Sequence, residues 1–314
     1  MQTLDVLERR IRSAEDLQSI VKTMKALAAV SIRHCERAVV SLAEYNRATI
    51  LGLQAVIGTQ AEGESGDAFG LTRAGRTGAI IFGSDQGMCG QFNEQIAGYS
   101  LARLSRLVSG PDQGRGEATP LLLAIGARAG AYLVDGGYRD ARVLPAPGTV
   151  QSITRMVREA LLVIEDWRMN AEVTRVFLFY NCRASGVLYQ PHLERLLPVN
   201  VRRASRKDSR PDKDAWPARS VPLFTMERDR LLSALIRQHV FVSLFRAFAE
   251  SMASENASRL AAMQAAENNI RDRLAELKAQ YHTQRQSLIT SEILDIISGF
   301  EALTQTPSAP APAQ

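Results

Sequence analysis

Apolar residues recur at a near-constant interval along the first part of the chain. From Leu4 to Val56 their mean spacing is about 3.5 residues, which is the period of a left-handed coiled-coil seam. No proline interrupts this segment. At about 1.5 Å per residue, the helix would be roughly 80 Å long. The pattern therefore predicts an N-terminal coiled-coil helix over residues 1–57.

The C-terminal part of the chain repeats this pattern. Seam positions extend from Leu231 to Leu303, and no proline lies between residues 227 and 303. We predict a second coiled-coil helix over 222–303. Two long helices at opposite ends of a chain can bury their apolar stripes against each other as an antiparallel pair. The longer C-terminal helix then extends past its partner, and part of its stripe faces something else.

Between these helices, short apolar runs alternate with helical patterns. Ala79–Phe82 and Leu121–Ile125 predict buried strands, and a further strand is expected at Arg175–Tyr180. Helices are expected over 91–108, from Gly126 onward and over 150–167. The last extended segment is expected over 187–197. This alternation predicts a Rossmann-like α/β domain over 78–198 with parallel strands. The expected fold class is α/β, with a long antiparallel coiled coil of the terminal helices and a small Rossmann-like domain.

Two segments differ from the rest in composition. Residues 199–221 are rich in arginine and lysine, which predicts a basic loop; a solvated linker and a specific anion or partner site remain alternatives. Residues 304–314 are rich in alanine and proline and are expected to be disordered. The net charge of +5 permits contact with an acidic partner or a membrane surface. The chain carries no zinc-finger or RNA-binding signature, so no nucleic-acid partner is expected.

The cysteines and the N-terminus indicate the compartment. Cys35, Cys89 and Cys182 are far apart, which favours a reducing, cytosolic environment. The N-terminus has no signal-peptide pattern, and no stretch approaches the roughly 18–20 apolar residues that a membrane span needs. We therefore expect membrane contact only through partners.

The segment Gly83–Gly90 follows an expected strand and precedes an expected helix, where phosphate-binding loops lie. It lacks both the Gly-Lys-[Ser/Thr] ending of a Walker A motif and a dinucleotide Gly-x-Gly-x-x-Gly. Nucleotide binding remains an alternative, but a structural turn close to another element is the favoured interpretation. Cys89 has no histidine nearby in sequence, so a catalytic thiol is not predicted. Four isolated histidines predict no metal site. They are His34, His192, His239 and His282.

The last helix carries short or flat polar side chains among its apolar ones. They run from Ser254 to Arg259 and recur at positions up to Glu292. A simple two-stranded rod would keep one freely charged face, so this pattern predicts hydrogen-bonding groups offered to a surrounding surface. An ordinary amphipathic helix with irregular patterning is the alternative.

Three motifs resemble the γ subunit of F-type ATP synthases, in the order of that family. Ile289–Leu303 is similar to its C-terminal signature, in which Ile-Thr is followed by acidic residues and by Gly-x-x-Ala-Leu. Lys22–Ala26 resembles its first helix, and Gly83–Gly90 resembles its Asp-x-Gly-Leu-Cys-Gly turn. The resemblance implies a central rotor shaft that couples ion translocation to ATP synthesis or hydrolysis. It also implies a non-catalytic subunit with no cofactor.

The resemblance further implies the partners and the site residues. The partners are the α and β subunits of the surrounding ring, the ε subunit and the membrane c-ring, at the cytoplasmic face of the bacterial inner membrane. The residues expected at the rotor–ring interface are Met24, Lys25, Arg259, Gln286, Thr290 and Glu292. The residues of the expected structural turn are Asp85, Gly87, Cys89 and Gly90. Phe300 replaces a usual small residue, which indicates a divergent bacterial form, or the form of an alternative F-type ATPase.

Two other classes of function stay open at this point. A coiled-coil scaffold or adaptor with an α/β head would have the same layout. A nucleotide-using enzyme would give the turn at Gly83–Gly90 a different role.

Overall fold

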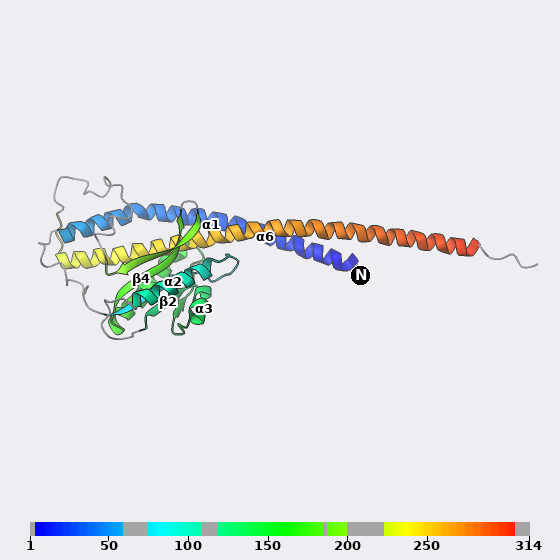
Figure 1. The fold of residues 1–314 in the computed structure, drawn as a ribbon. Coiled ribbons are helices and arrows are strands. Elements are labelled where there is room, and N and C mark those ends of the chain that lie inside the picture. The colour runs from blue at the N-terminus through cyan, green and yellow to red at the C-terminus, as the bar shows by residue number, and fades with distance from the viewer. Residues whose placement is uncertain (1–3, 59–74, 109–118, 185–186, 200–222, 305–314) are drawn as a thin grey trace, which may run out of the picture. The chain divides into compact units, whose positions relative to one another are not determined.

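The computed structural model describes residues 4–58, 75–108, 119–184, 187–199 and 223–304. The expected basic loop and the expected disordered tail lie outside these ranges, apart from one residue of each. The two long helices are α1 (Leu4–Gly58) and α6 (Arg228–Thr304), shown in Figure 1. The chain divides into two compact units. One unit contains 1–25 and 263–314, and the other contains 26–262.

In the first unit, segments of α1 and α6 pair in antiparallel orientation. Lys25 contacts Glu267, whereas Glu15, ten positions earlier, contacts Lys278, eleven positions later. The apolar seam is buried between them at Leu7, Val21, Leu274 and Leu277. From 285 to 301 every residue of α6 is exposed. The longer helix thus extends past its partner, as the helix lengths predicted.

The second unit is built on a five-stranded sheet with the order β3-β2-β1-β4-β5. Its strands are β1 (Arg76–Phe82), β2 (Leu121–Ile125), β3 (Arg142–Leu144), β4 (Val173–Ala184) and β5 (Val187–Leu197). The first four are parallel, but β4 and β5 are antiparallel, so the expectation of a parallel sheet was wrong for the edge strand. Two residues separate β4 from β5, and a connection this short can only join antiparallel neighbours.

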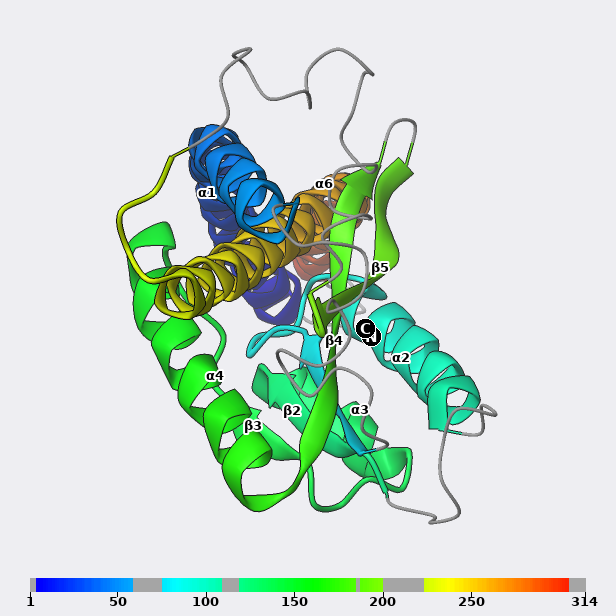
Figure 2. The same cartoon turned by 90° about the vertical axis from the view of Figure 1, so that its left-hand side faces the viewer.

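Helices cover both faces of the sheet (Figure 2). The helices within this unit are α2 (Phe92–Val108), α3 (Ala127–Asp135) and α4 (Val150–Asn170). On one face, Ile80 and Leu178 pack in a core with residues of α4 and α6. On the other face, Ile81 and Phe179 pack with residues of α2 and α3. Successive strand residues point to opposite faces, so continuous apolar strands supply both cores.

The part of α6 in this unit belongs to the core. Phe248 is buried and meets the ring of Phe82 edge-to-face, with centroids 4.8 Å apart. An 18-residue window of α6 has a mean hydropathy of 1.3, which by length and composition alone would allow a membrane span. The sequence reasoning missed this window because it searched for an uninterrupted apolar run. Of the window's residues, 39% are buried within the protein.

Candidate functional site

The turn after β1 is held by buried hydrogen bonds. The Gly83 amide donates to the carbonyl oxygen of Ile125 on β2, at 2.8 Å. The Ser84 amide donates to Asn93 Oδ1 at 2.9 Å, and Asn93 Nδ2 donates back to Ser84 Oγ at 2.8 Å. Asn93 lies in the first turn of α2. The backbone that leaves β1 is therefore fixed to both the next strand and the next helix.

Asp85 connects three segments at the carboxyl end of the parallel strands. Its Oδ1 accepts from the Ala127 amide at the start of α3, and its Oδ2 accepts from the Ala146 amide after β3, each at 2.9 Å. A doubly wound sheet binds ligand phosphates at this edge, where helix N-termini present free amides. Here a carboxylate of the chain itself occupies that position. This geometry favours the structural interpretation of the turn over nucleotide binding.

Cys89 and Gly90 approach α6 directly. Ser258 Oγ donates to the Cys89 carbonyl oxygen at 2.6 Å, and a Cβ on Gly90, whose φ is +55°, would lie 3.4 Å from Ser258 Oγ. Gly87 differs from them, because a Cβ there would meet only Arg128 Nη2 at 3.7 Å. The geometry therefore gives no reason for glycine at position 87. Met88, with φ of 59°, takes the left-handed conformation instead.

The polar cluster of the last helix binds the α/β part of the chain. Ser254 Oγ donates to the Asn181 carbonyl oxygen on β4 at 3.0 Å, and Asn181 Nδ2 donates to the Phe92 carbonyl oxygen at 3.2 Å. Together with Ser258, these bonds attach one face of α6 to the turn and to the sheet. The sequence reasoning predicted hydrogen-bonding groups here but expected an external surface. Two of these groups bind the chain's own domain, because the spacing of 254 and 258 places both hydroxyls on one helix face.

Arg259 is engaged within the chain. Its Nη2 contacts Glu255 Oε1 at 2.6 Å, and its Nη1 donates to Asn256 Oδ1 at 3.3 Å. The side chains of Arg259 and Glu255 are only 12% and 14% exposed. Burial raises the pKa of Glu255, Asp85 raises it further, and the Arg259 guanidinium opposes both. The pKa of Glu255 stays above its ordinary value, so Arg259 offsets the burial of this carboxylate only in part.

Lys25 is bound across the helix pair of the first unit. Its Nζ donates to Glu267 Oε2 at 2.5 Å and to Gln264 Oε1 at 3.0 Å. The hydrogen bond from Lys25 lowers the pKa of Glu267. Glu267 is 6% exposed, and Arg271 Nη2 lies 4.0 Å from its other carboxylate oxygen. Met24, the neighbouring expected interface residue, is half-buried.

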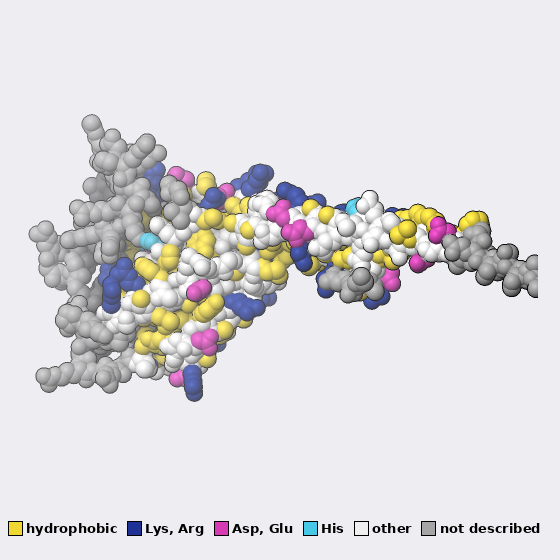
Figure 3. Space-filling view, turned by 45° about the vertical axis from the view of Figure 1, so that its right-hand side comes forward, with side chains coloured by type: hydrophobic (Ala, Val, Ile, Leu, Met, Phe, Trp, Pro, Cys, Tyr) yellow, Lys and Arg dark blue, Asp and Glu magenta, His cyan; other side chains and the backbone are white. Residues whose placement is uncertain are grey.

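The remaining expected interface residues lie on the extended end of α6. Gln286, Thr290 and Glu292 are exposed, and Thr290 Oγ1 donates to the Gln286 carbonyl oxygen of its own helix at 2.9 Å. Several large apolar side chains are exposed beside them (Figure 3). Ile293, Ile296 and Phe300 are the clearest examples, with Ile296 72% exposed. An exposed apolar patch of this kind marks an interaction surface.

Comparison with known proteins places the whole chain in one family. The model of the ATP synthase family matches residues 3–303. The ATP synthase gamma chain of Geotalea daltonii is 30% identical over 309 residues, covering 96% of this chain and 99% of the relative. The chain belongs to the ATP synthase gamma-chain family. The gamma chain of Anaeromyxobacter sp. strain Fw109-5 is also 30% identical, over 315 residues, with 96% and 100% coverage.

Solved structures show the same fold at lower identity. A chain of the Euglena gracilis mitochondrial ATP synthase, from a structure of its OSCP, F1 and c-ring, matches with a TM-score of 0.61. It is 16% identical, and the match covers 99% of both chains. A chain of the Tetrahymena thermophila central stalk and c-ring matches at 0.52 and 17% identity, over 79% of this chain and 99% of that one.

The ion pair between Lys25 and Glu267 predicts that the stability of this gamma-chain family member depends on pH. We expect Lys25→Met to lower the melting temperature of the full chain at pH 7. Because the folded pKa of Glu267 is depressed, the contribution of this pair is present above the ordinary carboxyl pKa and is lost as pH falls through the folded value. The difference from wild type should therefore close below about pH 4. Melting curves between pH 7 and pH 3 test this.

Lys278→Met is the matched control, because its ion pair with Glu15 is exposed at both ends (52% and 48%). It should change the melting temperature little at any pH. A Lys25→Met difference that stays constant down to pH 3 would contradict the assigned role of Glu267.

Proposed function

We propose that this chain is the central rotor shaft of an F-type ATP synthase. The observation that carries the proposal is similarity to ATP synthase gamma chains over nearly the full length of the chain. The layout supports it, because in the first unit segments of the terminal helices pair, and the C-terminal end of α6 extends past its partner and exposes apolar side chains. Such an end suits a bearing inside a ring of subunits. The shaft would couple ion translocation to ATP synthesis or hydrolysis.

The proposed shaft is non-catalytic and acts through its partners. These are the α and β subunits around the helix pair, and the ε subunit and c-ring at the α/β part. The chain associates peripherally with the membrane, and we assign it to the cytoplasmic face of the bacterial inner membrane. Its asymmetric surface would bias each catalytic subunit in turn by differential contacts, since only an interaction that differs between two states can shift their equilibrium.

The six interface candidates divide into two groups in this proposal. Met24, Gln286, Thr290 and Glu292 are exposed or half-buried and would contact the ring. Lys25 and Arg259 use their charged groups inside the chain, so they would stiffen the shaft. The turn at Asp85, Cys89 and Gly90 would attach the α/β part to α6, which transmits torque only where the two are joined firmly.

Copurification separates this function from a coiled-coil scaffold. A tagged chain expressed in its own host should bring down ATP synthase α and β subunits, and the complex should hydrolyse ATP. Recovery of the folded chain without these subunits would remove the rotor proposal and favour the scaffold. Micromolar nucleotide binding by the isolated chain would instead support an enzyme.

Met24→Lys is expected to uncouple the assembled complex. The substitution puts a cation at a half-buried apolar position beside Lys22 and Lys25, which would add a charge against the ring. We expect ATP-driven ion pumping in membrane vesicles to fall at least about tenfold, which corresponds to about 1.4 kcal/mol, while ATP hydrolysis persists. Met24→Leu keeps the apolar volume and should pump normally. Normal pumping by the lysine variant would remove Met24 from the interface.

A further inference from the structure

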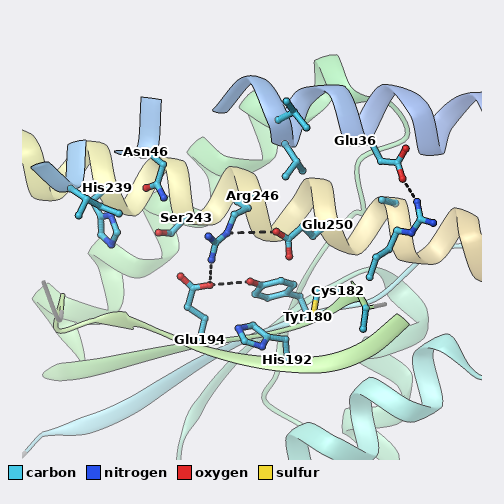
Figure 4. A pocket seen from close by; sticks show the side chains of 16 residues that line it. Glu36, Asn46, Tyr180, Cys182, His192, Glu194, His239, Ser243, Arg246 and Glu250 are labelled. Atoms are coloured by element: carbon cyan, nitrogen blue, oxygen red, sulfur yellow. Dashed lines mark hydrogen bonds and ion pairs between the residues drawn. The ribbon is translucent and has the colours of Figure 1, made fainter. Parts of the chain in front are cut away.

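The part of α6 in the second unit is packed into one face of the sheet. In the core on that face, α6 supplies seven buried side chains between Val240 and Ala253, whereas α1 supplies one, Cys35, among the described residues. Figure 4 shows α6 between α1 and the sheet, and Figure 2 shows the same order. A close-packed interior deforms little and transmits strain. By packing, the α/β part is therefore joined to α6 more than to α1.

Buried hydrogen bonds attach the same helix to the sheet. Ser254 Oγ donates to the Asn181 carbonyl oxygen of β4, and Ser258 Oγ donates to the Cys89 carbonyl oxygen in the turn after β1. All four of these residues are buried. Because water cannot readily replace a buried partner, breaking such a bond leaves a polar group unsatisfied. These two bonds therefore resist displacement of α6 against the sheet.

A buried ion pair makes a third attachment. Arg246 Nη2 on α6 donates to Glu194 Oε2 on β5 at 2.6 Å, and the Tyr180 hydroxyl on β4 donates to the same oxygen at 2.9 Å (Figure 4). Burial alone would raise the pKa of Glu194, but the Arg246 charge and both hydrogen bonds outweigh it and lower the pKa. The carboxylate is therefore ionised at neutral pH, and the pair attaches α6 to β4 and β5.

The attachment of α1 to the sheet is of a weaker kind. Glu36 of α1 forms an ion pair with Arg183 of β4, and both side chains are exposed. An exposed ion pair contributes little, because water screens it and two long side chains must be held in place. Near its C-terminal end α1 packs on α6 instead, where Leu53 and Val56 share a buried cluster with Leu232.

We propose that torque passes between the α/β part and the shaft through α6, with Ser254 and Ser258 as positioning residues. α6 is one continuous helix from Arg228 to Thr304, so a load that enters at these serines reaches its C-terminal end along the helix itself. In the second unit, α1 is carried by α6 and bears little of the load. This inference rests on the proposed rotor function and names the contacts on which that function depends.

Thermal fluctuation of the shaft tests the proposal, because the angular variance of an elastic joint is inversely proportional to its torsional stiffness. The complex of the full chain with its α and β subunits is fixed to a surface through the ring, without ATP. A bead is attached in every sample at the exposed α4 position 165 through Glu165→Cys. Ser254→Ala combined with Ser258→Ala should raise the angular variance at least about twofold, since both buried hydrogen bonds are lost.

Glu36→Gln combined with Arg183→Gln is the matched control, because it also changes two side chains between a long helix and the sheet. Its angular variance should stay within about 20% of wild type. Melting curves of the same variants separate torque transmission from stability. If the serine variant melts earlier but its variance equals that of wild type, the serines are merely structural and the proposal is overturned. An equal rise in variance for both double variants would overturn it too.

The wild-type complex distinguishes this inference from the rotor function itself. When ATP is added, the bead on the wild-type chain should rotate. A wild-type bead that does not rotate would contradict the proposed function, and this inference with it. Rotation of the wild-type bead together with an unchanged variance in the serine variant would contradict the α6 path alone.

Discussion

Replacing Gly126 with alanine should lower the free energy of unfolding of the α/β part of the chain by about 3 kcal/mol or more. Gly126 lies between β2 and α3 with a φ of +97°, a conformation that only glycine adopts easily. A Cβ at this position would lie 2.6–2.8 Å from three backbone atoms of Ser84. Backbone cannot yield as a side chain can. The same residue also donates its amide to the Leu144 carbonyl oxygen at 2.8 Å, so displacement would break a second contact.

Urea unfolding of the full chain, followed by circular dichroism, measures this effect. Gly148→Ala is the control, because a Cβ there has open space and the backbone φ is not positive. The free energy of unfolding of that variant should be within about 1 kcal/mol of wild type. Any difference should be a small gain in stability. Equal midpoints for the two variants would mean that the turn after β1 tolerates a shift of its backbone.

The long helices were the most predictable part of the fold. A 3.5-residue period sustained over many turns needs no tertiary information, because each turn repeats the same signal. β3 gave no such signal, since Arg142–Leu144 has only three residues and little burial. The direction of β5 depends on the two-residue connection from β4, and apolar content alone does not reveal it. The extension of α6 past its partner could be predicted from the lengths of the two helices alone.

The site was predictable only in its local part. The Gly83–Gly90 segment identified a turn, and Asp85, Cys89 and Gly90 lie together there. The hydrogen bond between this turn and α6 joins Ser258 and Cys89, which are 169 positions apart. No sequence period encodes such a pair, and the serines looked like an outward-facing polar surface. Lys25 was expected at an external interface, and its partner within the chain, Glu267, lies 242 positions away.

Arg246 is the clearest residue that sequence reasoning missed, and it carries the second large expected effect. We expect Arg246→Leu to lower the free energy of unfolding by about 2–3 kcal/mol. Removing one partner of a buried ion pair costs about 3–5 kcal/mol; Arg246 and Glu194 retain 25% and 19% exposure, which reduces this figure. The cost arises because the Glu194 carboxylate stays buried beside the Tyr180 hydroxyl after it has lost its cation.

Because the unpaired Glu194 carboxylate causes this loss, removing that carboxylate should restore stability. In the triple variant with Glu194→Leu and Tyr180→Phe, the Glu194 carboxylate and the Tyr180 hydroxyl are removed as well, and much of the lost stability should return, since well-packed apolar groups often replace a buried ion pair without loss. Urea unfolding of the single and triple variants measures this, with Arg155→Leu as control because its pair with Glu159 on α4 is exposed. The control should lower the free energy of unfolding by less than about 1 kcal/mol. If the triple variant is less stable than Arg246→Leu, the arginine acts mainly through the packing of its aliphatic stem, and the unpaired Glu194 charge is not the cause of the loss.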